Sequence, residues 1–181
     1  MMKRLFIGIP VSANDEISEL ITRLKSIDAA LSLVPADNLH FTLKFLGGVD
    51  ESKIAELEAK LESILKTEKK FEISLEGVGV FPDLQYLKVI WIGSKTKQLN
   101  LILGKIHACL SYIRKEDYND IPHLTIARVK SGKNKFELQE IVSDFKDKLF
   151  GRMMVDRVVL YESVLTEKGS VYKIEKEFKL R

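Results

Sequence analysis

The sequence predicts an α+β fold with two lobes, in which two mainly antiparallel sheets line a central cleft and helices lie on the outside. Helical and strand patterns alternate along the 181 residues, and adjacent strands in both halves favour antiparallel hairpins. The order of elements in the second half repeats that of the first with one strand fewer. No Gly/Ser linker separates the halves, so we expect residues 1–181 to form a single domain of two pseudo-symmetric lobes.

The composition excludes several classes of protein. Hydrophobic residues make up 45% and charged residues 30%, which is enough for a packed core and atypical of a disordered chain. No apolar run has the length of a membrane span, and the apolar patch in residues 1–10 is too short for a signal peptide. A single cysteine, Cys109, excludes an internal disulfide. We therefore expect a cytoplasmic protein, monomeric and without membrane partners.

The first quarter of the chain predicts a strand, a helix and a second strand. Residues 4–9 are almost entirely apolar and read as a strand. Ser12, with Asp15 three residues later, predicts the start of a helix whose apolar stripe continues to Leu31. A second strand is expected at 39–46, closed by two glycines.

The remaining elements follow from the same patterns. Asp50 and Asn134 are expected to cap helices, and the glycines within residues 77–83 are expected to end a strand in a loop. A turn is expected at 167–169. Strands are predicted near 71–75, 87–92, 123–129, 153–164 and 171–178, and apolar helical stripes at 54–65, 99–113 and 138–145.

The two halves share a tetrapeptide that combines histidine and threonine. His40-Phe41-Thr42-Leu43 begins one strand, and His123-Leu124-Thr125-Ile126 begins its counterpart 83 residues later. Because alternate residues of a strand share a face, each histidine lies beside its threonine while the apolar residues point into the core. One such pair alone is usually structural. Two copies at matching places in a chain with three histidines favour a shared function.

Other chemistries are poorly supported. No carboxylate or cysteine stands at metal-ligand spacing from either histidine, so we expect no metal and no cofactor. The chain has no nucleophile elbow and no P-loop, and the third histidine, His107, is expected to be structural. A symmetric pair of imidazoles is typical of paired acid–base catalysis, in which one ring accepts a proton while the other donates one. In-line phosphoryl transfer needs such groups on opposite sides of one phosphorus.

On these motifs the sequence resembles the 2H phosphoesterase superfamily, and most of all the RNA 2′,3′-cyclic phosphodiesterases, also called 2′-5′ RNA ligases. The resemblance spans nearly the whole chain. Its further blocks are Arg4-Leu5-Phe6-Ile7, residues 35–47, Gly77-Val78-Gly79-Val80-Phe81-Pro82, residues 122–128 and Leu160-Tyr161-Glu162-Ser163. One departure is Ile121, where relatives often have arginine, and this weakens the case for an extended basic RNA track.

The resemblance implies metal-free opening of a terminal 2′,3′-cyclic phosphate of RNA to a 2′-phosphate. It implies that His40 protonates the departing 3′-oxygen and that His123 activates water, although the motifs alone do not decide this polarity. Thr42 and Thr125 are implied to hold the phosphate oxygens. RNA 3′ ends, including tRNA halves, are the implied partners.

Three further residues carry expectations of their own. The resemblance implies that Arg128 faces the phosphate, although strict alternation from His123 places it on the opposite face unless the strand bulges. Phe81 is expected to stack on a nucleobase. Lys44 is expected on the His40 face, where it would steer anions.

Three other functions stay open on the sequence. The same residues support the reverse reaction, 2′-5′ joining of tRNA halves. A non-catalytic RNA- or nucleotide-binding module is the second alternative, which the intact motifs disfavour. The third is a related activity on a small cyclic nucleotide. Products and cleft shape, rather than sequence, distinguish these alternatives.

Overall fold

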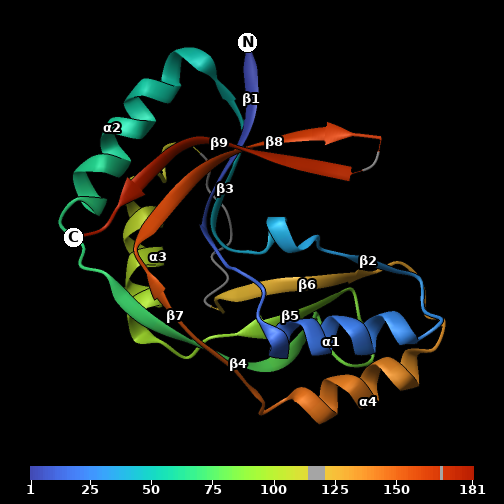
Figure 1. The fold of residues 1–181 in the computed structure, drawn as a ribbon. Helices are drawn as coiled ribbons and strands as arrows, with labels where there is room; N and C mark the ends of the chain where they lie inside the picture. The colour runs from blue at the N-terminus through green and yellow to red at the C-terminus, as the bar shows by residue number, and fades with distance from the viewer. Residues whose placement is uncertain (114–120, 168) are drawn as a thin grey trace.

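A computed structural model describes residues 1–113, 121–167 and 169–181 (Figure 1). Helical and strand segments alternate in these residues, as the sequence predicts. The α-helices are α1 (Asp15–Ser26), α2 (Ile54–Leu65), α3 (Lys97–Cys109) and α4 (Lys135–Phe145), with short 3₁₀ turns at Ala36–Asn38 and Glu51–Lys53. The strands are β1 (Met2–Pro10), β2 (Leu31–Leu33), β3 (His40–Asp50), β4 (Phe71–Phe81), β5 (Val89–Gly93), β6 (His123–Val129), β7 (Leu149–Val155), β8 (Arg157–Thr166) and β9 (Gly169–Lys179).

The strands pair in the order β7-β4-β5-β6-β3-β1-β8-β9, with β2 paired to β6. Every pairing between described strands is antiparallel, which confirms the predicted α+β class. The two predicted sheets are the two halves of one hydrogen-bonded sheet. At its centre β3 and β6 share a single register pair, Phe41 with Leu124, and beyond it the strands diverge.

Within the described residues, two helices cover each half of the sheet (Figure 1). α2 and α3 pack together on the half that contains β3 and β9, whereas α1 and α4 pack together on the half that contains β4 and β7. Helix α1 follows β1 along the chain but packs on the other half of the sheet. Its buried face, Ile17, Leu20 and Leu24, has the spacing of one helical stripe.

The first helix begins and ends differently from the prediction. Asn14, rather than Ser12, caps it, because the Asn14 side chain accepts a hydrogen bond of 2.9 Å from the backbone N–H of Ile17. The helix ends at Ser26, and Leu31 belongs to the short strand β2 instead of the helical stripe. An apolar residue at helical spacing does not distinguish a helix from a short strand, since both elements bury it against the same core.

The other predicted caps and the last turn have mixed outcomes. Asp50 caps the 3₁₀ turn that precedes α2, with its side chain accepting from the N–H of Ser52. Asn134 precedes α4 as predicted, but it has a left-handed backbone (φ 53°) and makes no capping hydrogen bond. In the predicted turn at 167–169, Lys168 lies outside the described residues.

Two strands continue past the glycines at which the sequence predicts them to end. Gly47 and Gly77 have φ values of 70° and 74°, and each lies at a shift in strand register, so β3 and β4 bend and continue. Conversely, the predicted strand 153–164 is broken at Asp156 into β7 and β8, which lie at opposite parts of the sheet. A bulge and a crossover depend on partner strands, which local pattern does not specify.

The buried apolar residues form one continuous cluster that runs through both halves of the sheet and all four helices. None of the helices in the described ranges is long and apolar enough to span a membrane.

Candidate active site

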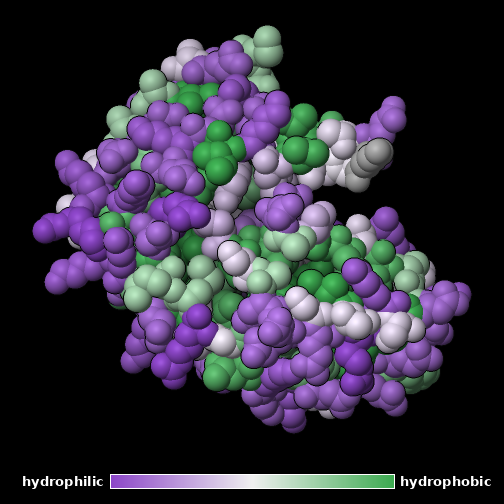
Figure 2. Space-filling model, in the orientation of Figure 1, coloured by the Kyte–Doolittle hydropathy of each residue, from purple (hydrophilic) through white to green (hydrophobic). Residues whose placement is uncertain are grey.

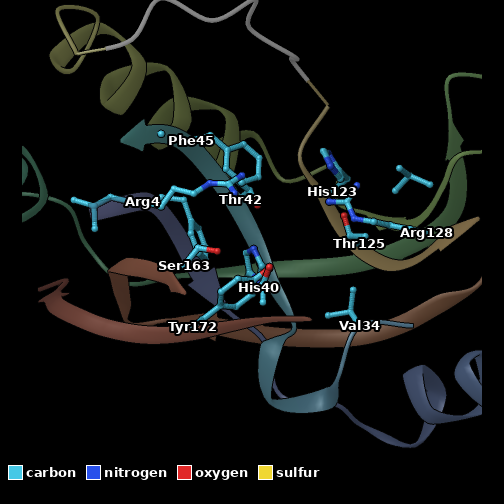
Figure 3. A pocket seen from close by; sticks show the side chains of 15 residues that line it. Arg4, Val34, His40, Thr42, Phe45, His123, Thr125, Arg128, Ser163 and Tyr172 are labelled. Carbon is cyan, nitrogen blue, oxygen red and sulfur yellow. The ribbon is translucent and has the colours of Figure 1, made fainter. Parts of the chain in front are cut away.

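Both His-x-Thr motifs line the same cavity, which has a volume of about 530 Å³ (Figure 3). It lies between the β8–β9 hairpin and the half of the molecule that carries α1 and α4, where the surface is hollowed (Figure 2). The cavity is lined by Arg4, Leu5, Phe6, Val34, His40, Thr42, Phe45, Gly47, Val89, His123, Thr125, Arg128, Ser163, Ser170 and Tyr172. The structure thus brings together five of the six predicted site residues, all except Phe81.

Residues 40–46 and 123–129 have the same burial pattern, in which half-buried and buried positions alternate over the first four residues and are followed by a buried, an exposed and a buried residue. In β3 the side chains of His40 and Thr42 face the cavity, while Phe41 and Leu43 are at most 2% exposed in the core. The motif in β6 repeats this arrangement. The predicted face of each motif is therefore confirmed.

Matched bulges follow the two threonines. In β3 the register with β1 skips Leu43, and in β6 the register with β5 skips Ile126. Each bulge reverses the alternation, so the residue five positions after each histidine, Phe45 or Arg128, also lines the cavity. This is the bulge that the position of Arg128 requires.

The prediction for Lys44 is wrong for the same reason. The bulge turns Lys44 away from the cavity, and the side chain is buried at 3% exposure. Its Nζ lies 3.4 Å from Nδ1 of His107, whose Nε2 lies 2.9 Å from the backbone carbonyl of Leu43. His107 therefore belongs to the packing behind β3, as the sequence predicts.

Each motif histidine is held in the same tautomer. His40 Nδ1 lies 2.6 Å from the carbonyl oxygen of Asn38, and His123 Nδ1 lies 2.9 Å from that of Ile121. A carbonyl oxygen only accepts, so Nδ1 carries the proton in both rings. Nε2 is then the nitrogen that exchanges a proton in each ring, as a base when neutral and as an acid when charged.

Aromatic side chains hold both imidazoles in place. The His40 ring lies 4.9 Å from that of Phe6 and meets Tyr172 edge-on at 5.3 Å. At the second imidazole, the Phe81 ring meets that of His123 edge-on, with a centroid distance of 4.8 Å, and also packs against Trp91. Phe81 is thus a neighbour of His123 outside the cavity lining, and its stacking on a nucleobase stays a prediction.

The surroundings lower the pKa of both histidines. For each ring the main cause is burial, which disfavours the charged form, and the hydrogen bond to the carbonyl opposes it. The positive charge of Arg128 lowers the pKa of both His40 and His123, and His123 also lowers that of His40. Both rings are therefore poised to be neutral near pH 7.

The cavity is suited to an anion. Its lining contains two arginines, two serines and two threonines but no carboxylate. In the described part of the chain, no group of three or more His, Cys, Asp or Glu side chains is placed to hold a metal ion. The arrangement provides hydroxyl and guanidinium donors for phosphate oxygens, with an imidazole on either side.

The sequence did not predict several residues of the cavity lining, among them Arg4, Phe45, Ser163 and Tyr172. Arg4 had a usable signal, because it is a charged residue at the start of an otherwise apolar strand. Phe45 had one as well, since it stands at the same spacing from His40 as Arg128 from His123. The serine and tyrosine come from the β8–β9 hairpin, whose position only the tertiary structure shows.

Known proteins resemble this chain over nearly its whole length. The chain is 34% identical to the RNA 2′,3′-cyclic phosphodiesterase of Methanothermobacter thermautotrophicus, with 99% of this chain and 100% of the relative covered. It is 37% identical to the protein of the same name from Methanocaldococcus jannaschii, with 97% and 99% covered. The crystal structure of TT0787 from Thermus thermophilus superposes with a TM-score of 0.83, at 25% identity and 98% coverage of both chains.

The family model described as LigT-like phosphoesterase matches residues 7–91 and residues 92–172, so that each match contains one His-x-Thr motif. The chain belongs to the LigT-like phosphoesterase family, the 2H phosphoesterases that its paired motifs resemble.

Proposed function

We propose that this protein hydrolyses the terminal 2′,3′-cyclic phosphate of RNA to a 2′-phosphate by acid–base catalysis with two histidines and no metal ion. The observation that carries the proposal is the facing pair of imidazoles, each with Nδ1 donating to a backbone carbonyl and Nε2 left for the cavity. The name shared by the relatives, RNA 2′,3′-cyclic phosphodiesterase, supports the substrate class.

In the proposed reaction, neutral His123 accepts a proton at Nε2 from a water molecule as the water oxygen attacks phosphorus. The bond between phosphorus and the 3′-oxygen breaks on the opposite side, and protonated His40 donates the Nε2 proton to that oxygen. The products are a 2′-phosphate and a free 3′-hydroxyl. His123 ends protonated and His40 neutral, and exchange with solvent restores the starting state.

The remaining predicted residues bind the phosphate in this proposal. The hydroxyls of Thr42 and Thr125 donate to the non-bridging oxygens, and the guanidinium of Arg128 offsets the charge that builds up on them. The location of Arg128 supports this role, because its positive charge lowers the pKa of both histidines. A mechanism of this kind needs no Lewis acid, since protonated and hydrogen-bonding side chains supply the positive charge.

The test is hydrolysis of an oligonucleotide with a 2′,3′-cyclic phosphate end, in the presence of EDTA, with product identity determined by chromatography. We expect a 2′-phosphate product, and His40→Ala and His123→Ala should each lower the rate by roughly 10²–10⁴-fold. Absence of turnover, or turnover that survives both substitutions, contradicts the proposal. RNA binding that survives both substitutions without turnover would instead indicate a binding module.

The same experiment with tRNA halves tests ligation. In ligation a 5′-hydroxyl takes the place of water, attacks the cyclic phosphate and forms a 2′-5′ linkage, while the 3′-oxygen leaves and both histidines keep their roles. We propose hydrolysis as the principal reaction, because water is in great excess over RNA ends. A ligated product in amounts that match the hydrolysed product would contradict hydrolysis as the principal reaction.

We further propose that residues 1–181 act as one domain of two pseudo-symmetric lobes, monomeric and in the cytoplasm. The continuous apolar cluster supports the single domain. The twofold match of the family model supports the duplication. Sedimentation equilibrium tests the monomer directly.

A further inference from the structure

A second polar group lies on the cavity wall beyond the histidines, in the half of the sheet that contains β1, β8 and β9. The register pairs Leu5 with Glu162, which places Ser163 of β8 level with Arg4 of β1. Both side chains line the cavity. In Figure 3 the Arg4 side chain extends along the wall toward Thr42, and Ser163 lies beside it. The hairpin and the first strand together therefore present a guanidinium and a hydroxyl on one face.

An aromatic row separates this group from the catalytic motif. Along β1, Gly8 pairs with Thr42, Phe6 pairs with Phe45, and Arg4 pairs with Gly48. Gly8, which pairs with Thr42, and Arg4 are four residues apart along β1, a distance of roughly 13 Å between their backbones in an extended strand. Between them lie Phe6 and Phe45, which pair across β1 and β3 and both line the cavity. The wall thus runs from phosphate donors, over aromatic rings, to a second set of donors.

The Arg4 charge has no partner among the described residues. No hydrogen bond or ion pair reaches its guanidinium within residues 1–113, 121–167 and 169–181. Two carboxylates on the adjoining strands β8 and β9, those of Glu162 and Glu175, are engaged by Lys3, with distances of 3.9 Å and 2.8 Å from its Nζ. An exposed arginine in a cavity without carboxylates is available to an anionic ligand.

Arg4 and Arg128 differ in their relation to the reacting centre. Arg128 lowers the pKa of both histidines, whereas Arg4 is not among the charges that shift either ring. Electrostatic influence falls with distance, which agrees with a position of Arg4 farther from the two rings than that of Arg128. The register gives the same order, because the backbone of Arg4 lies four residues along β1 from the position that pairs with Thr42. A second anionic group of the substrate is therefore the natural ligand of Arg4.

We propose that Arg4, with Ser163, binds the phosphodiester that joins the terminal nucleotide to the rest of the RNA chain. This inference rests on the proposed function and adds to it that the enzyme recognises a polynucleotide end in preference to a cyclic mononucleotide. The terminal nucleoside spans the aromatic row, its cyclic phosphate lies between the histidines, and its 5′-phosphate lies against the guanidinium.

The test compares three substrates that share the same reacting group: a 2′,3′-cyclic mononucleotide with a 5′-hydroxyl, a dinucleotide with a cyclic phosphate end, and the same dinucleotide with an uncharged methylphosphonate linkage. We expect Arg4→Gln to lower kcat/KM for the charged dinucleotide by roughly 10- to 100-fold, the usual effect of losing a charged hydrogen bond. For the other two substrates the change should stay within about 2-fold.

Arg152→Gln is the matched control, because Arg152 is an exposed strand arginine outside this cavity. It should leave all three rates unchanged. Salt dependence gives a second measurement. For the charged dinucleotide, Arg4→Gln should make the slope of log(kcat/KM) against log[salt] shallower by about 0.7, the contribution of one phosphate contact on a single strand.

Two results would overturn the inference. An equal loss on all three substrates would assign Arg4 to the reacting phosphate or to folding, and thermal unfolding of the variant separates these two. No loss on the charged dinucleotide would remove the second phosphate contact altogether. Failure of the wild-type protein to hydrolyse any of the three substrates would contradict the proposed function itself, which is a distinct outcome.

Discussion

Phe41 and Leu124 form the single register pair that joins β3 to β6, and they are themselves equivalent positions of the two motifs, 83 residues apart. An antiparallel pair of equivalent residues lies on an approximate two-fold axis. The flanking residues therefore place His40 opposite Thr125 and Thr42 opposite His123 across the junction. One contact in the core thus sets how the two histidines face each other.

The junction makes a first prediction about stability. Phe41 and Leu124 are both fully buried at 0% exposure, so truncation leaves a cavity at the centre of the sheet. Phe41→Ala should lower the free energy of unfolding by roughly 3–5 kcal/mol, measured by urea denaturation. Phe136→Ala, at a side chain that is 79% exposed, should change it by less than about 0.5 kcal/mol. Similar values for the two variants would contradict the role of the junction.

The pH dependence of activity gives a second prediction. Since one histidine must be neutral and the other charged, kcat/KM should depend on pH as a bell-shaped curve, whose two limbs report the pKa values of the two histidines in the free enzyme. Both values are lowered from 6.5, so the maximum should lie on the acid side of pH 6.5. Arg128→Gln removes a positive charge near both rings and should move both limbs to higher pH.

NMR titration of the two histidines in the free enzyme checks this shift without relying on the lower activity of the variant. Arg4→Gln is the control, because Arg4 is not among the charges that shift either ring. An unchanged titration in Arg128→Gln, or an equal shift in both variants, would show that Arg128 does not act on the histidine pair.

Gly8 gives a third prediction, which concerns the position of His40. A Cβ atom on Gly8 would lie 2.9 Å from the carbonyl oxygen of Phe41 and 3.3 Å from Cδ2 of His40. Gly8→Ala should therefore displace the His40 ring and lower kcat by up to about 10²-fold, since catalysis is sensitive to displacements near 1 Å. Gly132→Ala has open space around it and should leave kcat unchanged. Wild-type kcat in Gly8→Ala would refute the close packing.

The buried histidines also predict how stability depends on pH. The pKa of His40 is lower in the folded protein than its ordinary value of 6.5, so the folded state favours the neutral ring. This contribution is fully present above pH 6.5 and is lost as the pH falls through the lower folded value. Between pH 7 and pH 5, His40→Gln should therefore lose less unfolding free energy than the wild-type protein, as measured by urea denaturation at each pH. A steeper loss in the variant would reverse the sign and contradict the burial effect.

Much of this protein follows from its sequence, because the relevant signals are local. The His-x-Thr repeat, the face that it presents and the alternation of helices and strands depend on residue spacing within single segments, so the α+β class and the facing motifs were predictable. The bulges after Thr42 and Thr125 were not, since a register shift depends on the partner strand; the bulges decide that Arg128 lines the cavity and that Lys44 does not. The pairing of Arg4 with Ser163 and the packing of α1 on the other half of the sheet also required the tertiary structure, because they join segments more than 150 residues apart or on opposite parts of the sheet. Long-range pairing selects among arrangements that the local pattern leaves equivalent, and in this chain that selection assembles the site.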